Sequence, residues 1–298
     1  MLQMLIPDSL SKQDLPPACL YIVASPIGNL GDITLRAIHV LNQMDGIACE
    51  DKRQSSLLLS HFSIHKPLLA LHEHNEREGA HELIARLRQG ERWAYLSDAG
   101  TPGISDPGAR LVMQVRSEGF RVIPIPGVSS ISTALSIAGE ILLNEKGKFQ
   151  FVGFLPTQKN ELEKIFSSII ESSLPTVFFE SPHRIAKTLF RLEELLTNDR
   201  CLLIARELTK KFESIELLRP PQFREWLTDP NNQKGEFVLI LSGRNQEALS
   251  EMSADHLTLA NLLKNHLSSK DLTFILQKMY GLDKKAAYDT ALLVKKNN

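Results

Sequence analysis

Residues 96–108 combine the residue types that a ligand-binding loop needs. Three glycines, two prolines and two aspartates lie between an apolar run, residues 93–96, and a helical pattern, residues 109–117. Glycine lets the backbone approach a ligand closely, and proline fixes a turn. In open α/β sheets, ligands bind beyond the carboxyl ends of the strands. The stretch therefore predicts a binding loop between a buried strand and a helix.

Two further loops have the same character. Residues 25–34 follow the first apolar run of the chain, and residues 124–130 follow a later one. Neither has the glycine pattern of a dinucleotide-binding fold or the Gly-Lys-Ser/Thr of a P-loop. Ser129 is either a helix N-cap alone or, together with Ser130, one side of a ligand crevice. Three such loops in one half of the chain favour the crevice.

Both signs of charge follow the second predicted strand, at Glu50, Asp51, Lys52 and Arg53. One interpretation is an acidic pair that complements the dipole of the next helix, beside solvated basic neighbours. The other is a substrate-facing cluster, in which a carboxylate accepts a proton and Arg53 binds phosphate. The position at a strand end favours the second.

The second half of the chain carries acids and bases behind two of its strands, namely Glu180 and Arg184 and then Arg206, Glu207 and Lys210. Solvated salt bridges are common and contribute little to stability. The alternative is that the basic side chains hold an anionic substrate and that Glu180 or Glu207 transfers a proton. Taken together, the two clusters favour the alternative.

The histidines and cysteines predict no metal site. Residues 72–76, His-Glu-His-Asn-Glu, lack the spacing of a helical zinc motif, and no Cys or His pair follows at zinc-finger spacing. A substrate-lining loop is the preferred interpretation. Cys19, Cys49 and Cys201 lie in apolar, strand-like contexts, which is typical of free thiols in a reducing cytoplasm.

Short apolar runs alternate with helical patterns, which indicates an α/β protein with a parallel sheet covered on both faces. The polar residues 139–148 interrupt this alternation, and a polar linker, residues 244–254, precedes a few short helical patterns. These form either a helix-turn-helix-like unit or a packing appendage. We therefore expect a loosely structured arm at 1–17, α/β domains at 18–140 and 149–243, and a helical extension at 255–298.

The predicted strands are 20–24, 46–49, 68–70, 93–96, 121–125, 149–154, 176–179, 202–205, 236–241 and an added, antiparallel one within 211–218.

The composition and net charge of the chain limit the kinds of partner that it can bind. The chain has 298 residues, of which 43% are hydrophobic and 23% charged, with a formal net charge of -1. Such a charge gives no global attraction to nucleic acid or membranes, so a nucleic-acid substrate needs local basic patches. No apolar run approaches membrane-spanning length, and the N-terminus lacks the pattern of a signal peptide. A cytoplasmic protein without a membrane partner is expected.

The order of these motifs resembles the ribosomal RNA small-subunit methyltransferase I family of the tetrapyrrole methylase superfamily. The resemblance begins with residues 20–37 and covers about residues 20–243. A helical C-terminal extension is also similar to that of the family. The other matching motifs are residues 72–76, 97–108, 153–156, 205–210 and 234–236.

The resemblance implies two α/β domains with S-adenosylmethionine bound between them, in a homodimer. It also implies methyl transfer to the ribose 2′-oxygen of a cytidine in 16S ribosomal RNA. The cofactor contacts expected by motif match are Pro26, Gly100, Thr101, Ile104, Ser129, Ser130, Phe179 and Ala205. The residues expected on the substrate side are Glu50, Arg53, Arg184, Arg206 and Lys210.

A ribose hydroxyl is a poor nucleophile, so a nearby base should help to remove its proton. Glu207 and Asp98 are the two candidates for this base. Two rival functions remain open. One is a methyltransferase of the same fold that acts on a small molecule such as a tetrapyrrole. The other is a non-catalytic RNA-binding or ribosome-assembly module.

Overall fold

The computed structural model describes residues 12–72, 75–104, 108–143, 145–244, 256–282 and 284–296. The chain forms two compact units, Met1–Ser242 and Gly243–Asn298. Most of the predicted arm (residues 1–11) and most of the predicted linker (residues 245–254) lie outside the described residues.

The first sheet is entirely parallel, as predicted, with the strand order β3-β2-β4-β1-β5. Its strands are β1 (Cys19–Val23), β2 (Gly46–Cys49), β3 (Leu68–Ala70), β4 (Arg92–Leu96) and β5 (Arg121–Ile125). The helical segments between them are η2 (Leu30–Asp32), α2 (Leu35–Gln43), α3 (Lys52–His61), α4 (Glu76–Arg88) and α5 (Ala109–Ser117).

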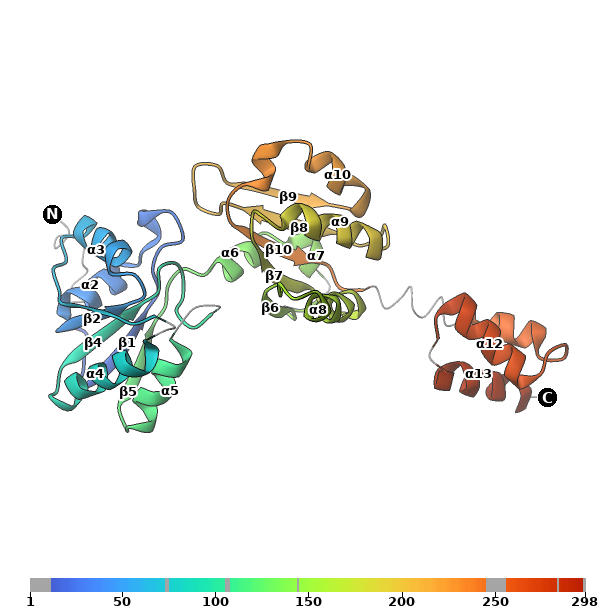
Figure 1. Ribbon diagram of the computed structural model, residues 1–298, viewed down its shortest axis with the longest axis horizontal. Helices are drawn as coiled ribbons and strands as arrows, with labels where there is room; N and C mark the ends of the chain where they lie inside the picture. Colours follow the sequence, from blue (N-terminus) through green and yellow to red (C-terminus); the bar gives the residue numbers. More distant parts are fainter. Residues whose placement is uncertain are drawn as a thin grey trace. The chain divides into compact units, whose positions relative to one another are not determined.

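Helices cover both faces of this sheet, as Figure 1 shows. Successive strand residues point to opposite faces, so Tyr21 packs with α2 and α3, and its neighbour Leu20 packs with α4 and α5. The same alternation separates Trp93 from Ala94 on β4. Burial on both faces explains the continuous apolar runs of the sequence and leaves the carboxyl edge for polar loops.

The second sheet is mixed, with the order β6-β7-β10-β8-β9. The last strand in the chain, β10, lies in the middle and is antiparallel to both of its neighbours, and β9 is antiparallel to β8, as predicted. The strands are β6 (Gln150–Phe154), β7 (Thr176–Glu180), β8 (Leu202–Arg206), β9 (Ser214–Leu218) and β10 (Phe237–Leu241). The helices of this half are α8 (Lys159–Glu171), α9 (Ile185–Leu195), η3 (Pro220–Gln222), α10 (Phe223–Trp226) and η4 (Pro230–Gln233).

Two short helices after β5 cover one face of the second sheet. They are α6 (Ser130–Ser136) and α7 (Gly139–Leu142), and α7 lies where the sequence predicted a break in the pattern. Ala134 of α6 and Ile141 of α7 pack in one buried cluster with Val177, Val238 and Ile27 of the loop after β1. Apolar packing therefore joins both sheets within one compact unit, and the domain boundaries at 140 and 149 stay a prediction.

The C-terminal unit is helical, as predicted. Residues 256–263 are helical, followed by α12 (Ser269–Tyr280) and α13 (Lys284–Lys296). Ser268 caps α12 by accepting a hydrogen bond from the Asp271 N–H at 3.1 Å, and Gly281 ends it in a left-handed conformation. Both signals were visible in the sequence.

Replacing the Ser268 cap should weaken α12 in the intact chain. We expect Ser268→Ala to lower the free energy of opening of this helix by about 1 kcal/mol, because the Asp271 N–H loses its partner. Amide hydrogen exchange of α12 measures this change. Ser269→Ala, one residue into the helix, is the matched control and should not weaken it, and equal effects of the two substitutions would contradict the capping role.

Candidate functional site

Two of the predicted binding loops pair with each other. Backbone hydrogen bonds of 2.9 and 3.0 Å run both ways between Ser25, just after β1, and Gly100, just after β4. The Ser25 hydroxyl also donates to the Ser97 carbonyl at 3.0 Å. Gly100 has φ +75°, a left-handed conformation that favours glycine. The glycine therefore allows the loop after β4 to turn back onto the loop after β1.

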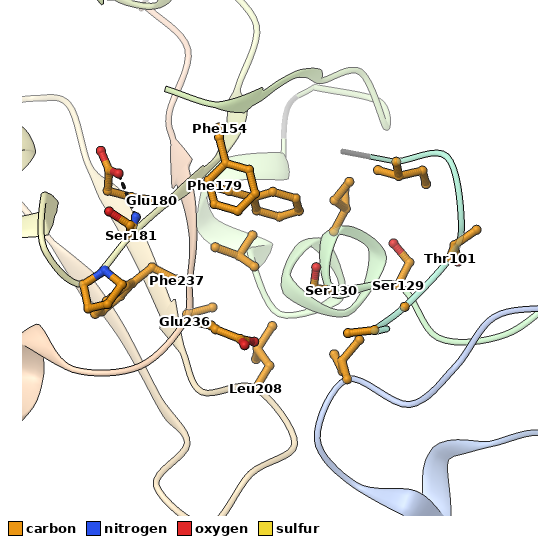
Figure 2. Close-up of a pocket in the computed structure, with 18 residues that line it drawn as sticks. Thr101, Ser129, Ser130, Phe154, Phe179, Glu180, Ser181, Leu208, Glu236 and Phe237 are labelled. Carbon is orange, nitrogen blue, oxygen red and sulfur yellow. Dashed lines mark hydrogen bonds between the residues drawn. The ribbon is translucent and has the colours of Figure 1, made fainter. Parts of the chain in front are cut away.

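The third loop joins this pair through Thr101, whose hydroxyl donates to the Val128 carbonyl at 2.8 Å. Ser129 is the N-cap residue of α6, but its side chain makes no capping hydrogen bond. The capping interpretation therefore does not account for this hydroxyl. Ser129 and Ser130 line a cavity instead (Figure 2).

This cavity, about 340 Å³ in volume, lies where the three loops meet the strand ends of the second sheet (Figure 2). Ligand pockets typically span about 300–1,000 Å³. Every predicted cofactor residue except Pro26 lines it, and Pro26 lines an adjoining cavity. The lining residues are Ile27, Ala99, Gly100, Thr101, Ile104, Ser129, Ser130, Ile131, Phe154, Phe179, Glu180, Ser181, Pro182, Ala205, Leu208, Glu236, Phe237 and Val238. Their contacts with a cofactor stay a prediction.

An aromatic pair forms one wall of the cavity. The ring centroids of Phe154 and Phe179 lie 5.2 Å apart, and Phe154 is 55% exposed although it ends a strand of the sheet. Ring faces of this kind stack on flat heteroaromatic groups. The aromatic wall thus suits the adenine of S-adenosylmethionine, and the hydroxyls of Thr101, Ser129 and Ser130 in the same cavity suit its polar groups. Sequence reasoning missed Phe154, whose signal was the Gly-Phe-Leu-Pro motif around it.

The buried Glu180 forms an ion pair with Arg184, whose side chain is 25% exposed, beside the cavity. Glu180 is 2% exposed, and its carboxylate accepts from Arg184 Nη2 at 2.7 Å, the Ser181 N–H at 2.7 Å and the Thr188 hydroxyl at 2.6 Å. Arg184 also donates to the carbonyls of Leu155 and Pro156. The guanidinium is thus engaged within the protein, and its contact with a substrate stays a prediction.

Glu207, Lys210 and Glu236 form a second charged network. Lys210 Nζ lies 2.9 Å from Glu207 Oε1 and 3.0 Å from Glu236 Oε2, and the Glu236 N–H donates to Glu207 Oε1 at 2.9 Å. Burial disfavours the charge on Glu207, but hydrogen bonds from Lys210 and the Glu236 backbone outweigh it and lower its pKa. Burial likewise opposes the charge on Lys210, but both carboxylates outweigh it and raise its pKa. Sequence reasoning missed the role of Glu236.

The backbone around this network is strained. Glu207 has φ +52° and Thr209 has φ +68°, a left-handed conformation that is rare for any residue other than glycine and most unfavourable for a β-branched one. Gly235 lies so close to Glu207 that a Cβ atom there would stand 2.5 Å from Glu207 Cγ. Such strain persists where the surrounding structure holds it, often at functional sites.

Asp98 lies in the adjoining cavity, just before Ala99, which lines both cavities. Its carboxylate accepts from the Asp51 N–H at 3.2 Å. Partial desolvation of the carboxylate raises the pKa of Asp98, and the negative charge of Asp51 adds to this against the hydrogen bond from the Asp51 N–H. Burial and the charge of Asp98 also raise the pKa of Glu50 at the end of β2. Asp98 is thus a carboxylate suited to accepting a proton.

The remaining predicted substrate residues occupy different places. Arg206 is buried and donates to the Ser214 hydroxyl and the Lys234 carbonyl, so its guanidinium is engaged within the protein. Arg53 is exposed in the first turn of α3 and lines a shallow depression with Lys52. Of these two arginines, Arg53 has the more open position for a phosphate group.

The described residues contain no cluster of His, Cys, Asp and Glu suited to a metal ion. Glu73 and His74 of the predicted substrate-lining loop lie outside the described residues. No described helix is both long and apolar enough to span a membrane.

The fold and the cavity define the class of protein. Residues 19–219 match the family of tetrapyrrole (corrin/porphyrin) methylases. Among solved structures, uroporphyrin-III-C-methyltransferase from Thermus thermophilus aligns with a TM-score of 0.52 at 20% identity, over 76% of this chain and 94% of that one. Cobalt precorrin-4 methyltransferase, a cobalamin biosynthetic enzyme, aligns with a TM-score of 0.57 at 18% identity, over 76% and 95% of the two chains. The fold is that of the tetrapyrrole methylases.

Sequence relatives narrow the class further. Ribosomal RNA small subunit methyltransferase I of Pasteurella multocida is 43% identical over 274 residues, which cover 92% of this chain and 96% of the relative. The protein of the same name from Haemophilus influenzae is 44% identical over 275 residues, with the same coverage. The chain belongs to the ribosomal RNA small subunit methyltransferase I family, as its motifs predicted.

Proposed function

We propose that the protein transfers a methyl group from S-adenosylmethionine to the ribose 2′-oxygen of a cytidine in 16S ribosomal RNA. The observation that carries this proposal is the cavity where three glycine-bearing or serine-bearing loops face the Phe154–Phe179 pair. Relatives named for methylation of small-subunit ribosomal RNA, 43% and 44% identical over 92% of the chain, support the choice of acceptor.

The chain's own residues would hold the donor on two sides. The aromatic pair would stack on the adenine, and the loops with Gly100, Thr101 and Ser129 would offer backbone and hydroxyl groups to the polar parts. When bound, S-adenosylmethionine supplies a methyl carbon whose bond to sulfur breaks, leaving the electron pair on sulfur, as the bond to the ribose oxygen forms. Fixing donor and acceptor in line removes much of the barrier.

Asp98 is the preferred acceptor for the 2′-hydroxyl proton. It lies in the cavity that adjoins the donor site, and partial desolvation raises its pKa, which makes the carboxylate a stronger base. Glu207 is the less suitable candidate, because its Oε1 already accepts from Lys210 and from the Glu236 N–H. Glu207 instead holds Lys210 and Glu236 in place.

The proposal extends to the wider setting of the reaction. The protein acts in the cytoplasm as a homodimer, with α/β domains at 18–140 and 149–243 on either side of the donor. Glu50, Arg53, Arg184, Arg206 and Lys210 form the substrate side, with Arg53 as the direct phosphate contact and Arg184 and Arg206 as supports of the site.

Methyl transfer to defined acceptors tests the proposed function. Small ribosomal subunits from cells that lack this gene are incubated with the protein and S-adenosylmethionine labelled in the methyl group, followed by mapping of 2′-O-methyl sites. Label on a single cytidine of the 16S RNA is the expected result. Label on a tetrapyrrole but not on the subunits favours the small-molecule methylase, and RNA binding without any transfer favours a non-catalytic module.

Replacing the aromatic ring of Phe179 should weaken donor binding. We expect Phe179→Leu to raise the Kd for S-adenosylmethionine about threefold to tenfold, since aromatic contacts contribute about 0.5–1.5 kcal/mol beyond their buried area. Isothermal titration calorimetry measures the Kd. Phe190→Leu, on a half-exposed ring of α9 outside the cavity, is the control. An unchanged Kd in Phe179→Leu would contradict stacking at this wall.

A further inference from the structure

A second cavity adjoins the donor cavity in the first compact unit. Its volume is about 480 Å³, and it shares Ile27, Ala99 and Glu236 with the donor cavity. An acceptor atom at this shared edge would therefore lie next to the donor cavity. The lining residues are Pro26, Ile27, Gly28, Leu30, Gln54, Ser55, Leu57, Leu58, His61, Ser97, Asp98, Ala99, Lys210 and Glu236.

Two parts of the lining of this second cavity differ in chemistry. The charged groups that line it are Asp98, Lys210 and Glu236, and Glu236 also lines the donor cavity. Residues of α3 form another part of the lining, which includes the apolar side chain of Leu57 and the polar ones of Gln54 and His61. A carboxamide both donates and accepts, so it can pair with the edge of a base whose rings rest on apolar atoms. This part suits a nucleobase.

A depression with two cations continues beyond α3. It is lined by Lys52, Arg53, Ser56 and Leu68, and Leu57 belongs both to it and to the second cavity. In the part of the chain that the structure describes, no carboxylate forms an ion pair with Lys52 or Arg53. On a chain of net charge -1, these two exposed cations offer a local basic site for the phosphates of an RNA backbone.

Lys210 closes the cavity rather than adding to this patch. A Cβ atom on Gly28 would lie 2.4 Å from Lys210 Cγ, so the lysine stem packs directly on the loop after β1. Its ammonium is held by Glu207 and Glu236. Among the lysines and arginines that line this cavity and the depression, Lys52 and Arg53 are therefore the ones available to a phosphate.

On the basis of the proposed function, we propose that the second cavity holds one unstacked pyrimidine nucleotide of the RNA. Its ribose lies at the edge shared with the donor cavity, beside Asp98 and Glu236, and its base lies against Gln54 and Leu57 of α3. The neighbouring phosphates lie along Lys52 and Arg53. A nucleotide taken out of its stack exposes its ribose and the edge of its base together, and the second cavity offers separate groups to each.

Two substitutions on α3 test this proposal through RNA binding. Leu57→Glu places a negative charge where the two depressions meet, on a side chain that is 72% exposed, so folding should be preserved. Arg53→Gln removes one phosphate contact. The measurements are the affinity for small ribosomal subunits as a function of salt concentration, the Kd for S-adenosylmethionine, and the KM and kcat for methyl transfer. Met113→Glu and Arg116→Gln, both on exposed side chains of α5, are the matched controls.

We expect Leu57→Glu to weaken subunit binding and raise KM at least about tenfold, with kcat and donor affinity nearly unchanged. Arg53→Gln should reduce the slope of log affinity against log salt by about 0.7–0.9. Subunit affinity that is unchanged in both α3 variants, or equally lowered in the α5 controls, overturns the proposal. If the wild-type protein binds subunits but transfers no methyl group, the proposed function is overturned instead. The subunit affinities of the two α3 variants then still show whether the RNA binds at α3.

Discussion

Asp98→Asn is expected to lower kcat for methyl transfer by about 10²–10⁴-fold, the usual contribution of a general base. The amide has nearly the shape of the carboxylate and can still accept from the Asp51 N–H. It cannot take the proton of the ribose hydroxyl. Single-turnover methylation of small ribosomal subunits measures the loss, and the Kd for S-adenosylmethionine should stay nearly unchanged because Asp98 lines the adjoining cavity.

The dependence of kcat on pH provides a second readout for Asp98. Only the ionised carboxylate accepts a proton, so activity falls as pH decreases through its pKa. Burial raises that pKa, which places the fall at a higher pH than for an ordinary aspartate. In Asp98→Asn this acidic limb should disappear. Glu207, whose pKa is lowered, would place the limb at a lower pH.

Two further variants separate the candidates for the base. Asp199→Asn, on an exposed loop, controls for loss of a negative charge and should keep full activity. Glu207→Gln is expected to impair the positioning of Lys210 and Glu236 but to retain the acidic limb. If Asp98→Asn keeps its kcat and Glu207→Gln loses the limb, the base is Glu207 and not Asp98.

The sequence predicted the three loops of the first sheet better than the part of the donor cavity that the second sheet contributes. The loops after β1, β4 and β5 are local signals, because glycine and proline are needed where parallel strands end at one edge. The wall with Leu208, Glu236 and Phe237 depends on β10, which enters between β7 and β8. An apolar run predicts that β10 is a strand, but its place in the sheet is decided by long-range packing.

The left-handed backbone conformation of Glu207 and Thr209 could not be predicted from the sequence either. Neither residue favours a positive φ, so the local pattern predicted only a charged segment behind a strand. Contacts with Gly28, Gly235 and Glu236, all distant in sequence, hold the turn in place. The same contacts place Lys210 in the wall of the second cavity, and its contact with a substrate stays a prediction.

Arg184→Met is expected to lower the free energy of unfolding by about 3 kcal/mol, the low end of the cost of breaking a buried ion pair, because the Arg184 side chain is 25% exposed. The substitution leaves the Glu180 carboxylate, 2% exposed, without its cation and leaves the Leu155 and Pro156 carbonyls without a donor. Urea unfolding followed by circular dichroism measures the change. Arg88→Met is the control, since Arg88 and Glu118 form an exposed pair worth about 0–1 kcal/mol.

The double variant Glu180→Gln/Arg184→Met separates the stability lost to an uncompensated Glu180 carboxylate from the stability lost to altered packing. If the cost of Arg184→Met comes from the uncompensated carboxylate, neutral Gln at 180 should restore a large part of the lost stability. The same pair orders residues 180–182 on the wall of the donor cavity, so the single variant should also bind S-adenosylmethionine more weakly than Arg88→Met does. If Arg184→Met instead loses RNA binding while its stability and its affinity for S-adenosylmethionine stay unchanged, Arg184 is a substrate contact. An arginine that orders residues 180–182 could not be replaced without lowering stability or donor affinity.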